Sequence, residues 1–382
     1  MDLRKEMMTR LMRGERMVDL CRDYGISRKT GNKFKERFDQ LGVAGLADQS
    51  RAPRVIPHRT PPEVAEMIVA ARRAHPSWGA RKLKDVLEQR GHQAPSHGAI
   101  ERVIARAGLV APRKRRPRHA ATESTTLRTA NAPGDVWCID YKGQFRLGDQ
   151  SYCYPLTITD QFSRYVIACE GMAAISDEEA REVCHDVFRQ WGVPGAMRSD
   201  NGAPFASTGL LGLTKLSAYF LQLGIALERI RPGHPEENGR HERMHRTLKA
   251  ETTRPARTNL LQQQERFDDW QQEFNHERPH EALAMKRPAE VFAASPNAMP
   301  EQLPELAYPL HDDTLRVSNW GDINIAGLGP VRLTRALAGQ HVGIREEVDG
   351  QWLVTFASLD LGYAKGGNRL EPIQPNLPES KL

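Results

Sequence analysis

Cysteine is scarce in this sequence, and the cysteine spacing excludes the structures that cysteine usually builds. The chain has five cysteines in 382 residues, an odd number that cannot pair completely. No two of them form a C-x2-C pair, so the spacing indicates neither a disulfide framework nor a cysteine zinc site. Most of them lie inside apolar runs. We therefore expect buried free thiols in a reducing compartment.

Long hydrophobic runs are also missing. The mean hydropathy is -0.58, and no run approaches the roughly 18 apolar residues that a membrane-spanning helix needs. The first residues, Met1–Glu6, contain no apolar signal core. The sequence therefore predicts a cytoplasmic, nucleoid-associated protein with no membrane part. Its length predicts about two to four domains.

Acidic residues are few in the N-terminal third. Residues 1–120 contain 27 Lys and Arg against 13 Asp and Glu, whereas the remainder contains 27 against 35. The basic surplus, which gives the chain its net charge of +6, is therefore entirely N-terminal. Such a surplus attracts polyanions, of which DNA is the obvious one. A basic surface that only improves solubility is the alternative.

Residues 1–50 have the pattern of a helix-turn-helix DNA-binding domain. Two helical stretches are separated by a break at Tyr24-Gly25-Ile26-Ser27, and Ser27 can cap the second of them. That second helix is rich in polar and cationic side chains, as a recognition helix is. A short basic helix pair without a DNA role remains the alternative. The candidate DNA contacts are Arg28, Lys29, Asn32 and Lys33.

A second helical module and a basic linker follow. Residues 58–110 predict three helices, beginning near Thr60, Trp78 and Ser96, in a weaker helix-turn-helix pattern. Residues 111–134 then lack apolar periodicity and form a basic linker that could follow a phosphate backbone. A solvated hinge would have the same composition. The candidate DNA contacts in the linker are Arg113, Lys114, Arg115 and Arg116.

Residues 135–295 predict a mixed α/β sheet covered by helices. Three β-like runs separated by short turns indicate an antiparallel meander. The runs are 136–145, 152–159 and 164–170; they are followed by a helix that Ser176 caps, a strand that reaches Asp200, a helix over 208–223, a strand over 225–230, and helices over 236–252 and 259–276. Residues 310–375 are strand-like, with a hairpin signal at Asp349-Gly350, and predict a small β-barrel.

Three acidic residues lie in local settings that suit a divalent-metal site. Asp140 lies in the first β-like run, Asp200 ends a later strand, and Glu242 lies on a following helix. Acids placed in this way can converge on one edge of such a sheet. Phosphodiester chemistry needs an activated nucleophile and a stabilised leaving oxygen, and two Mg²⁺ ions roughly 3.5–4 Å apart supply both through carboxylate ligands.

Each acid also has an ordinary structural explanation. Asp140 could lie exposed at a strand end, and Asp200-Asn201-Gly202 is a common turn sequence. Glu242 could join an ion-pair ladder on the helix surface. A fourth acid nearby, Asp160, is better explained by turn chemistry. The residues alone leave these alternatives open.

Four segments, in this order, resemble the retroviral-type integrase core of bacterial insertion-sequence transposases, the DDE recombinases with an RNase H-like fold. The resemblance covers roughly residues 130–292. Each segment is weak alone, and the order carries the signal. They are Trp137-x-x-Asp140, Ser199-Asp200-Asn201-Gly202-x-Pro204-Phe205, Gly233-His234-Pro235-x-x-Asn238-Gly239-x-x-Glu242-Arg243-x-His245-x-x-Leu248-Lys249, and Arg278-Pro279-His280-x-Ala282-Leu283.

The resemblance implies a role for each matching residue. It implies Asp140, Asp200 and Glu242 as catalytic ligands of two Mg²⁺ or Mn²⁺ ions. It also implies that DNA contacts come from the same helix region, at Asn238, Arg246 and Lys249.

The spacing of the second and third acids departs slightly from the family. Between Asp200 and Glu242 lie 41 residues, a little more than the usual spacing. Glu236 or Glu237 would restore the shorter spacing, but the Asn-Gly-x-x-Glu-Arg match favours Glu242.

The leading interpretation is an active transposase acting on double-stranded DNA. It would bind the terminal inverted repeats of its element, expose a 3′-hydroxyl by hydrolysis, and join that hydroxyl to target DNA without a covalent intermediate. Cleavage and joining at both ends of the element imply a homo-oligomer on DNA. The alternatives are a sequence-specific DNA-binding regulator with a non-catalytic core, and a nuclease of the same fold that does not join ends.

Overall fold

The computed structural model describes residues 2–49, 59–110, 127–347 and 350–373. The chain divides into two compact units, Met1–Pro61 and Pro62–Leu382. The basic linker residues Arg113, Lys114, Arg115 and Arg116 lie outside the described residues.

The first unit contains a three-helix domain. Asp2–Met12 (α1), Met17–Asp23 (α2) and Arg28–Leu41 (α3) are followed by the short 3-10 helix Gly42–Leu46. The Ser27 side chain accepts the backbone N–H of Thr30 at the start of α3, as the cap prediction requires. The buried side chains that hold the helices together are Met7, Met8, Leu20, Cys21 and Leu46.

The second unit begins with three more helices, Pro62–Ala74 (α4), Ala80–Gln89 (α5) and His97–Arg106 (α6). The Ser96 side chain accepts the backbone N–H of Ala99 and caps α6. Ile100, Val103 and Ile104 are buried, as the sequence pattern predicts.

The central sheet combines antiparallel and parallel strands. Its strand order is β2-β3-β1-β5-β6, with β4 paired to β3. Strands β1, β3 and β4 pair in antiparallel fashion, which confirms the expected meander. Strands β5 and β6 then extend the sheet in parallel with β1. The strands are Val136–Tyr141 (β1), Phe145–Arg146 (β2), Tyr152–Asp160 (β3), Val166–Met172 (β4), Ala196–Ser199 (β5) and Ala226–Arg229 (β6).

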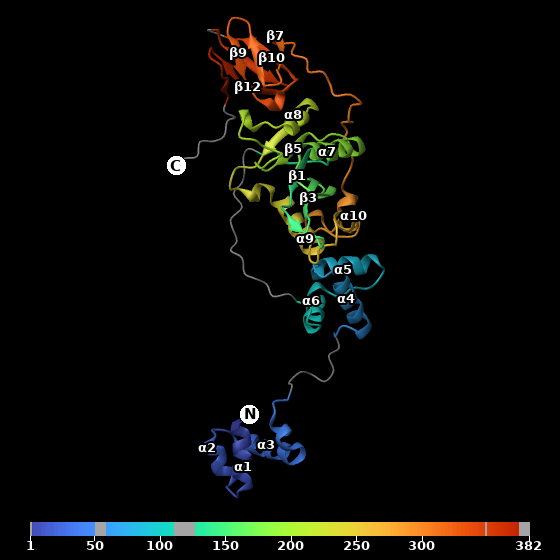
Figure 1. The fold of residues 1–382 in the computed structure, drawn as a ribbon. Coiled ribbons are helices and arrows are strands. Elements are labelled where there is room, and N and C mark those ends of the chain that lie inside the picture. Colours follow the sequence, from blue (N-terminus) through green and yellow to red (C-terminus); the bar gives the residue numbers. More distant parts are fainter. Residues whose placement is uncertain (1, 50–58, 111–126, 348–349, 374–382) are drawn as a thin grey trace. The chain divides into compact units, whose positions relative to one another are not determined.

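Helices cover both faces of this sheet (Figure 1). Asp177–Trp191 (α7) and Lys215–Gln222 (α8) contribute Phe188 and Phe220 to one core cluster, which also contains Trp137. Gly239–Thr252 (α9) and Leu260–His276 (α10) bury Leu248 and Phe267 against the other face. The two clusters make a three-layer α/β/α arrangement.

Two expected boundaries are wrong. The run 136–145 breaks after Tyr141, and Phe145–Arg146 forms a separate two-residue strand. The helix expected from residue 208 begins at Lys215, because Thr214 caps it with a capping box. Before it lies the 3-10 segment Leu210–Gly212, in which Leu211 has a φ of 47°.

The C-terminal region contains two sheets. One has the order β13-β12-β11-β10-β7, and the other pairs β8 with β9. The expected closed barrel is not confirmed, because in the described residues β7 and β13 end the larger ladder, and β8 and β9 form a separate pair that reaches the rest of the chain through one isolated bridge between Arg332 and Arg369. Asp349 of the expected hairpin lies outside the described residues. The strands are Asp313–Arg316 (β7), Asp322–Ile325 (β8), Gly329–Arg332 (β9), His341–Glu346 (β10), Trp352–Phe356 (β11), Leu359–Ala364 (β12) and Glu371–Pro372 (β13).

Two expectations from composition can be compared with the structure. All five cysteines are free and buried, as predicted. Among the described residues, no helix is both long and apolar enough to cross a membrane.

Candidate active site

Asp140 lies near the end of β1, on the face of the sheet that α9 covers. It pairs across the antiparallel ladder with Thr157 of β3, whose hydroxyl donates to the Asp140 backbone carbonyl at 3.1 Å. The Asp140 side chain is 14% exposed. A carboxylate this deeply placed needs a partner, because burial disfavours its charged form.

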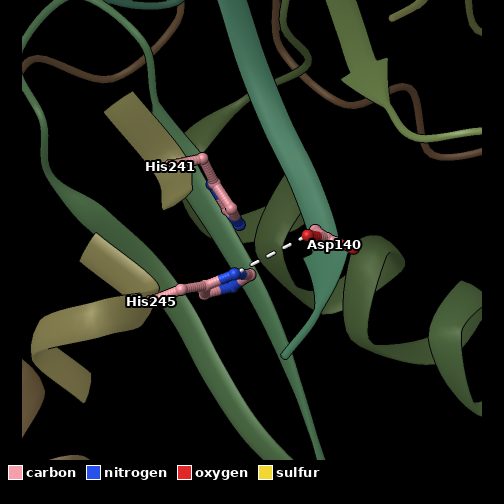
Figure 2. Close-up of side chains that lie close together, drawn as sticks. All are labelled: Asp140, His241 and His245. Atoms are coloured by element: carbon pink, nitrogen blue, oxygen red, sulfur yellow. Dashed lines mark ion pairs between the residues drawn. The ribbon is translucent and has the colours of Figure 1, made fainter. Parts of the chain in front are cut away.

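Two histidines of α9 face Asp140 across this site, as Figure 2 shows. His241 and His245 are buried one helical turn apart, and their ring centroids are 4.3 Å apart. One potential ligand atom from each histidine and one from the Asp140 carboxylate lie within 4.8 Å of one another. Sequence reasoning missed both as site residues, although their positions continue the buried stripe of Met244 and Leu248 along α9.

Hydrogen bonds fix the state of the two imidazoles. The Thr157 hydroxyl has one proton, which it donates to Asp140, so it accepts from Nε2 of His241 at 2.9 Å and from Nε2 of His245 at 2.7 Å. Nδ1 of His241 then accepts from the Thr159 hydroxyl at 2.7 Å. Burial lowers the pKa of His241 to about 3 and that of His245 well below its ordinary value, so both rings are neutral.

This network decides which atoms can serve as metal ligands. Both nitrogens of His241 are engaged by threonine hydroxyls. Nδ1 of His245 has no hydrogen-bond partner among the described residues and points at Asp140. Of the three clustered residues, only Asp140 and His245 therefore offer an atom without an existing bond. A three-ligand site at this cluster would have to break a buried hydrogen bond.

Asp200 directly follows β5, the parallel neighbour of β1. Cys138 pairs with Arg198, and both acids follow two residues later. The Asp200 carboxylate accepts the backbone N–H of Gly202 at 2.9 Å, so the turn chemistry considered for this sequence is present. The same turn fixes the position of the carboxylate at the end of β5.

Glu242 lies in the first turn of α9. Its side chain is 46% exposed, and its Oε2 is 3.9 Å from the Lys142 ammonium. The rival acids are engaged elsewhere: Glu237 binds Arg231 at 2.6 Å, and Glu236 lies 2.8 Å from the His234 ring.

The three acids act on one another electrostatically. The pKa of Asp140 rises to about 7, first because the side chain is buried and then because the charges of Asp200 and Glu242 lie nearby. The Lys142 cation opposes this rise only in part. The arrangement is a concentration of negative charge that a bound cation would relieve.

Asp160, by contrast, has a structural role. Its side chain is buried and accepts from Gly134, and from both the backbone N–H and the hydroxyl of Ser163. The interpretation as turn chemistry is confirmed.

The candidate DNA contacts differ in exposure. The side chains on α3 are exposed, and so are Arg246 and Lys249 on α9. Asn238 is buried, and its side-chain oxygen has no hydrogen-bond partner among the described residues. The α3 residues are Arg28, Lys29, Asn32 and Lys33.

Four family models match the chain. Two describe an integrase core domain and match residues 130–235 and 223–288, so the first contains Asp140 and Asp200 and the second contains Glu242. A helix-turn-helix domain matches residues 3–54, and a homeodomain-like domain matches residues 30–104.

Curated relatives from insertion elements are similar over most of their own length. The insertion element IS407 uncharacterized 31.7 kDa protein of Burkholderia multivorans is 29% identical over 223 residues, covering 58% of this chain and 77% of the relative. The insertion element IS476 uncharacterized 39.2 kDa protein of Xanthomonas euvesicatoria is 26% identical over 254 residues, covering 66% of this chain and 71% of the relative. The chain therefore carries an integrase core domain and helix-turn-helix domains, and it is similar to proteins of insertion elements.

Further similarities are to viral proteins. The Pol polyprotein of feline endogenous virus ECE1 is 27% identical over 174 residues, covering 46% of this chain and 16% of the polyprotein. A solved structure of the HTLV-2 integrase catalytic core domain in complex with magnesium is 14% identical, covers 43% of this chain and 99% of that one, and has a TM-score of 0.34.

Proposed function

We propose that the chain is a metal-dependent transposase that cleaves DNA at the ends of its element and joins them to a target. The observation that carries this proposal is the register of β1 and β5, which sets Asp200 level with Asp140, while Glu242 lies in the first turn of α9 over the same face. The charges of Asp200 and Glu242 reach Asp140 and help to raise its pKa to about 7, so the three carboxylates are poised to share a cation. The match to integrase core models and the similarity to insertion-element proteins support nucleic acid as the substrate.

The donor set fits Mg²⁺ or Mn²⁺. Asp140, Asp200 and Glu242 offer hard carboxylate oxygens, which these ions prefer, and no cysteine lies among them. Such ions, two in our proposal, would lower the pKa of an attacking water or 3′-hydroxyl and stabilise the leaving oxygen. The protein would hold the three carboxylates in place through β1, the turn after β5 and the first turn of α9.

The flanking modules supply DNA binding in this proposal. The exposed residues Arg28, Lys29, Asn32 and Lys33 of α3 would contact the terminal inverted repeats. The basic linker would follow the phosphate backbone toward the core. Arg246 and Lys249 continue the exposed stripe of Glu242 along α9 and would contact phosphates beside the metal site. Pairing two element ends would require a homo-oligomer.

The test compares DNA binding with strand transfer on substrates that carry the element ends. Asp140→Asn, Asp200→Asn and Glu242→Gln should each abolish metal-dependent nicking and joining while leaving binding to the ends unchanged. Glu236→Gln, at the position that the shorter spacing would select, is the matched control and should remain active. A triple variant that still joined ends would overturn the proposal. Binding without nicking in the wild type would favour a DNA-binding regulator.

A further inference from the structure

A second concentration of charge, positive this time, lines a cavity beside α9. The cavity has a volume of about 570 Å³. Its walls come from α5, the turn between β3 and β4, α9, and the segment after α10. Asp160 is the one acid that lines it. The cations that line it are Lys82, Arg164, Arg240, Arg243, Arg246 and Arg278. We call this feature the cationic cavity.

The cationic cavity lacks counter-charges. Among the described residues, Arg278 is the only lining cation in an ion pair, with Glu251 at 3.0 Å. Both oxygens of Asp160 are already engaged by backbone N–H groups and by Ser163. Arg164 and Arg240 donate to the Gln161 backbone carbonyl, which carries no charge. Most of the positive charge is therefore uncompensated.

Burial and neighbouring positive charges lower the pKa of two of these cations. Burial, together with the charges of Arg240 and Arg243, lowers the pKa of Arg164 to about 10. Burial and Arg278 lower the pKa of Lys82 to about 8. Nε2 of His280, another lining residue, is buried without a hydrogen-bond partner among the described residues. An anion with several acceptor oxygens would satisfy all of these groups.

The cationic cavity lies close to the carboxylates along the same strand. Thr159 lines it, and Thr159 is two residues along β3 from Thr157, which pairs with Asp140. Two residues of a strand span roughly 7 Å. A chain of linked phosphates that passed Asp140 could therefore reach the cavity within a short distance.

We propose that the cationic cavity binds a phosphate group of the DNA backbone near the position where Asp140 acts on the strand. This inference rests on the proposed function for the identity of the polyanion. The recognising groups are guanidinium ions, which match phosphate oxygens in a planar, bidentate way. The contact is independent of base sequence, because a phosphate carries no sequence information.

The test measures how the affinity of the full chain for a short duplex depends on salt concentration, in EDTA so that no chemistry occurs. Arg240→Gln with Arg243→Gln removes two exposed cations from the cavity. The slope of log affinity against log salt should fall by about 1 to 2, because each lost phosphate contact removes roughly 0.9. At low salt this corresponds to a loss of affinity of about tenfold or more.

The matched control is Arg189→Gln with Lys215→Gln, two exposed cations of the same core outside the cavity. This pair should leave the slope unchanged. Equal effects of the two double variants would overturn the proposal, because the binding would then reflect only general surface charge. If the cavity double variant did not fold, Arg243→Gln alone should lower the slope by about 1.

A second experiment distinguishes a cavity that binds DNA phosphate from one that binds free phosphate. Inorganic phosphate is added at constant ionic strength, and the midpoint of thermal unfolding is recorded. Stabilisation by phosphate that the cavity double variant loses, with an unchanged DNA slope, would overturn the proposal in favour of a free-anion site. Because binding is measured without metal, a chain that binds DNA through the cavity but never nicks it would contradict the proposed function and leave this inference standing.

Discussion

Nδ1 of His245 lies 3.6 Å from a carboxylate oxygen of Asp140, and among the described residues no hydrogen bond satisfies that nitrogen. The opposite ring nitrogen is held by Thr157 at 2.7 Å, so the ring cannot turn away without losing a buried bond. Thr157 in turn donates to the Asp140 backbone. The histidine therefore bonds to the threonine that holds the backbone of Asp140 in place.

His245 should act as a positioning residue for Asp140. His245→Asn removes the ring while keeping a polar side chain, and should reduce strand transfer about 10- to 100-fold, as the loss of a group that orients a metal ligand does. The affinity for element ends should stay the same. The decisive measurement is the Mg²⁺ concentration that gives half-maximal strand transfer, which should be higher for His245→Asn than for the wild type.

A control on the same helix separates positioning from loss of stability. Thr252 is also buried on α9, and its hydroxyl donates only to the Leu248 carbonyl at 2.8 Å. Thr252→Ala should lower the midpoint of thermal unfolding without changing the Mg²⁺ requirement. If both variants shifted the Mg²⁺ requirement equally, the positioning role of His245 would be wrong.

The ion pair between Arg198 and Glu228 should stabilise the sheet beside Asp200. The two side chains are buried on neighbouring strands, with donor and acceptor 2.8 Å apart. Glu228→Gln leaves the buried guanidinium without a counter-charge, and should lower the free energy of unfolding by up to about 3–5 kcal/mol. Denaturant titration measures this loss, and Glu265→Gln on the exposed side of α10 should change it little.

A second variant tests whether the charge or the packing matters at this pair. Replacing both partners, as Arg198→Met with Glu228→Leu, removes the unpaired charge and should recover most of the lost stability. If the double variant were less stable than Glu228→Gln alone, the paired charges would be essential to the fold.

His280 should make the protein sensitive to acid. Burial and neighbouring cations lower the pKa of this side chain to about 3, against an ordinary value of 6.5. As the pH falls below 6.5, the unfolded chain gains a proton that the folded chain does not bind, so stability decreases toward pH 3. Near pH 4.5 the wild type should lose about 1–3 kcal/mol more than His280→Gln.

Denaturant midpoints at neutral pH and at pH 4.5 test this expectation. His92→Gln, which removes an exposed histidine, is the control and should follow the wild type at both pH values. An equal acid loss in wild type and His280→Gln would show that this ring does not cause the sensitivity.

The sequence predicted the elements of the core well, because local rules determine them. Ser27 and Ser176 each cap a helix as predicted, and a helix begins after Ser96 as predicted, since such starts depend on residues within one turn. The helix expected from residue 208 failed because a capping box at Thr214 outweighed the apolar residues before it. The sequence could not show whether the C-terminal strands close into a barrel, because closure depends on pairing between strands that are distant in the sequence.

The candidate site was predicted only in part, for a similar reason. The order of Asp140, Asp200 and Glu242 along the chain was visible in the sequence, and the family models span all three. The imidazole support behind Asp140 was not visible, because His241 and His245 look like members of an apolar stripe until α9 is packed on β3. Their role depends on tertiary contacts.

Metal binding should distinguish the carboxylate set from the histidine cluster. Mg²⁺ or Mn²⁺ at about a hundred times its dissociation constant should stabilise the wild type by about 2.7 kcal/mol. Asp140→Asn should abolish the shift, and Asp200→Asn and Glu242→Gln should reduce it, because all three carboxylates share the ion. The measurement is the thermal unfolding midpoint as a function of metal concentration.

The same titration with Zn²⁺ tests the alternative that the metal binds the histidine cluster. The cluster of Asp140, His241 and His245 is the geometry that a softer ion would select. Zn²⁺ should give no stabilisation that depends on His241, because both His241 nitrogens are already bonded. A Zn²⁺ shift that depended on His241 but survived Glu242→Gln would show that the metal binds the histidine cluster, and would remove Glu242 from the ligand set.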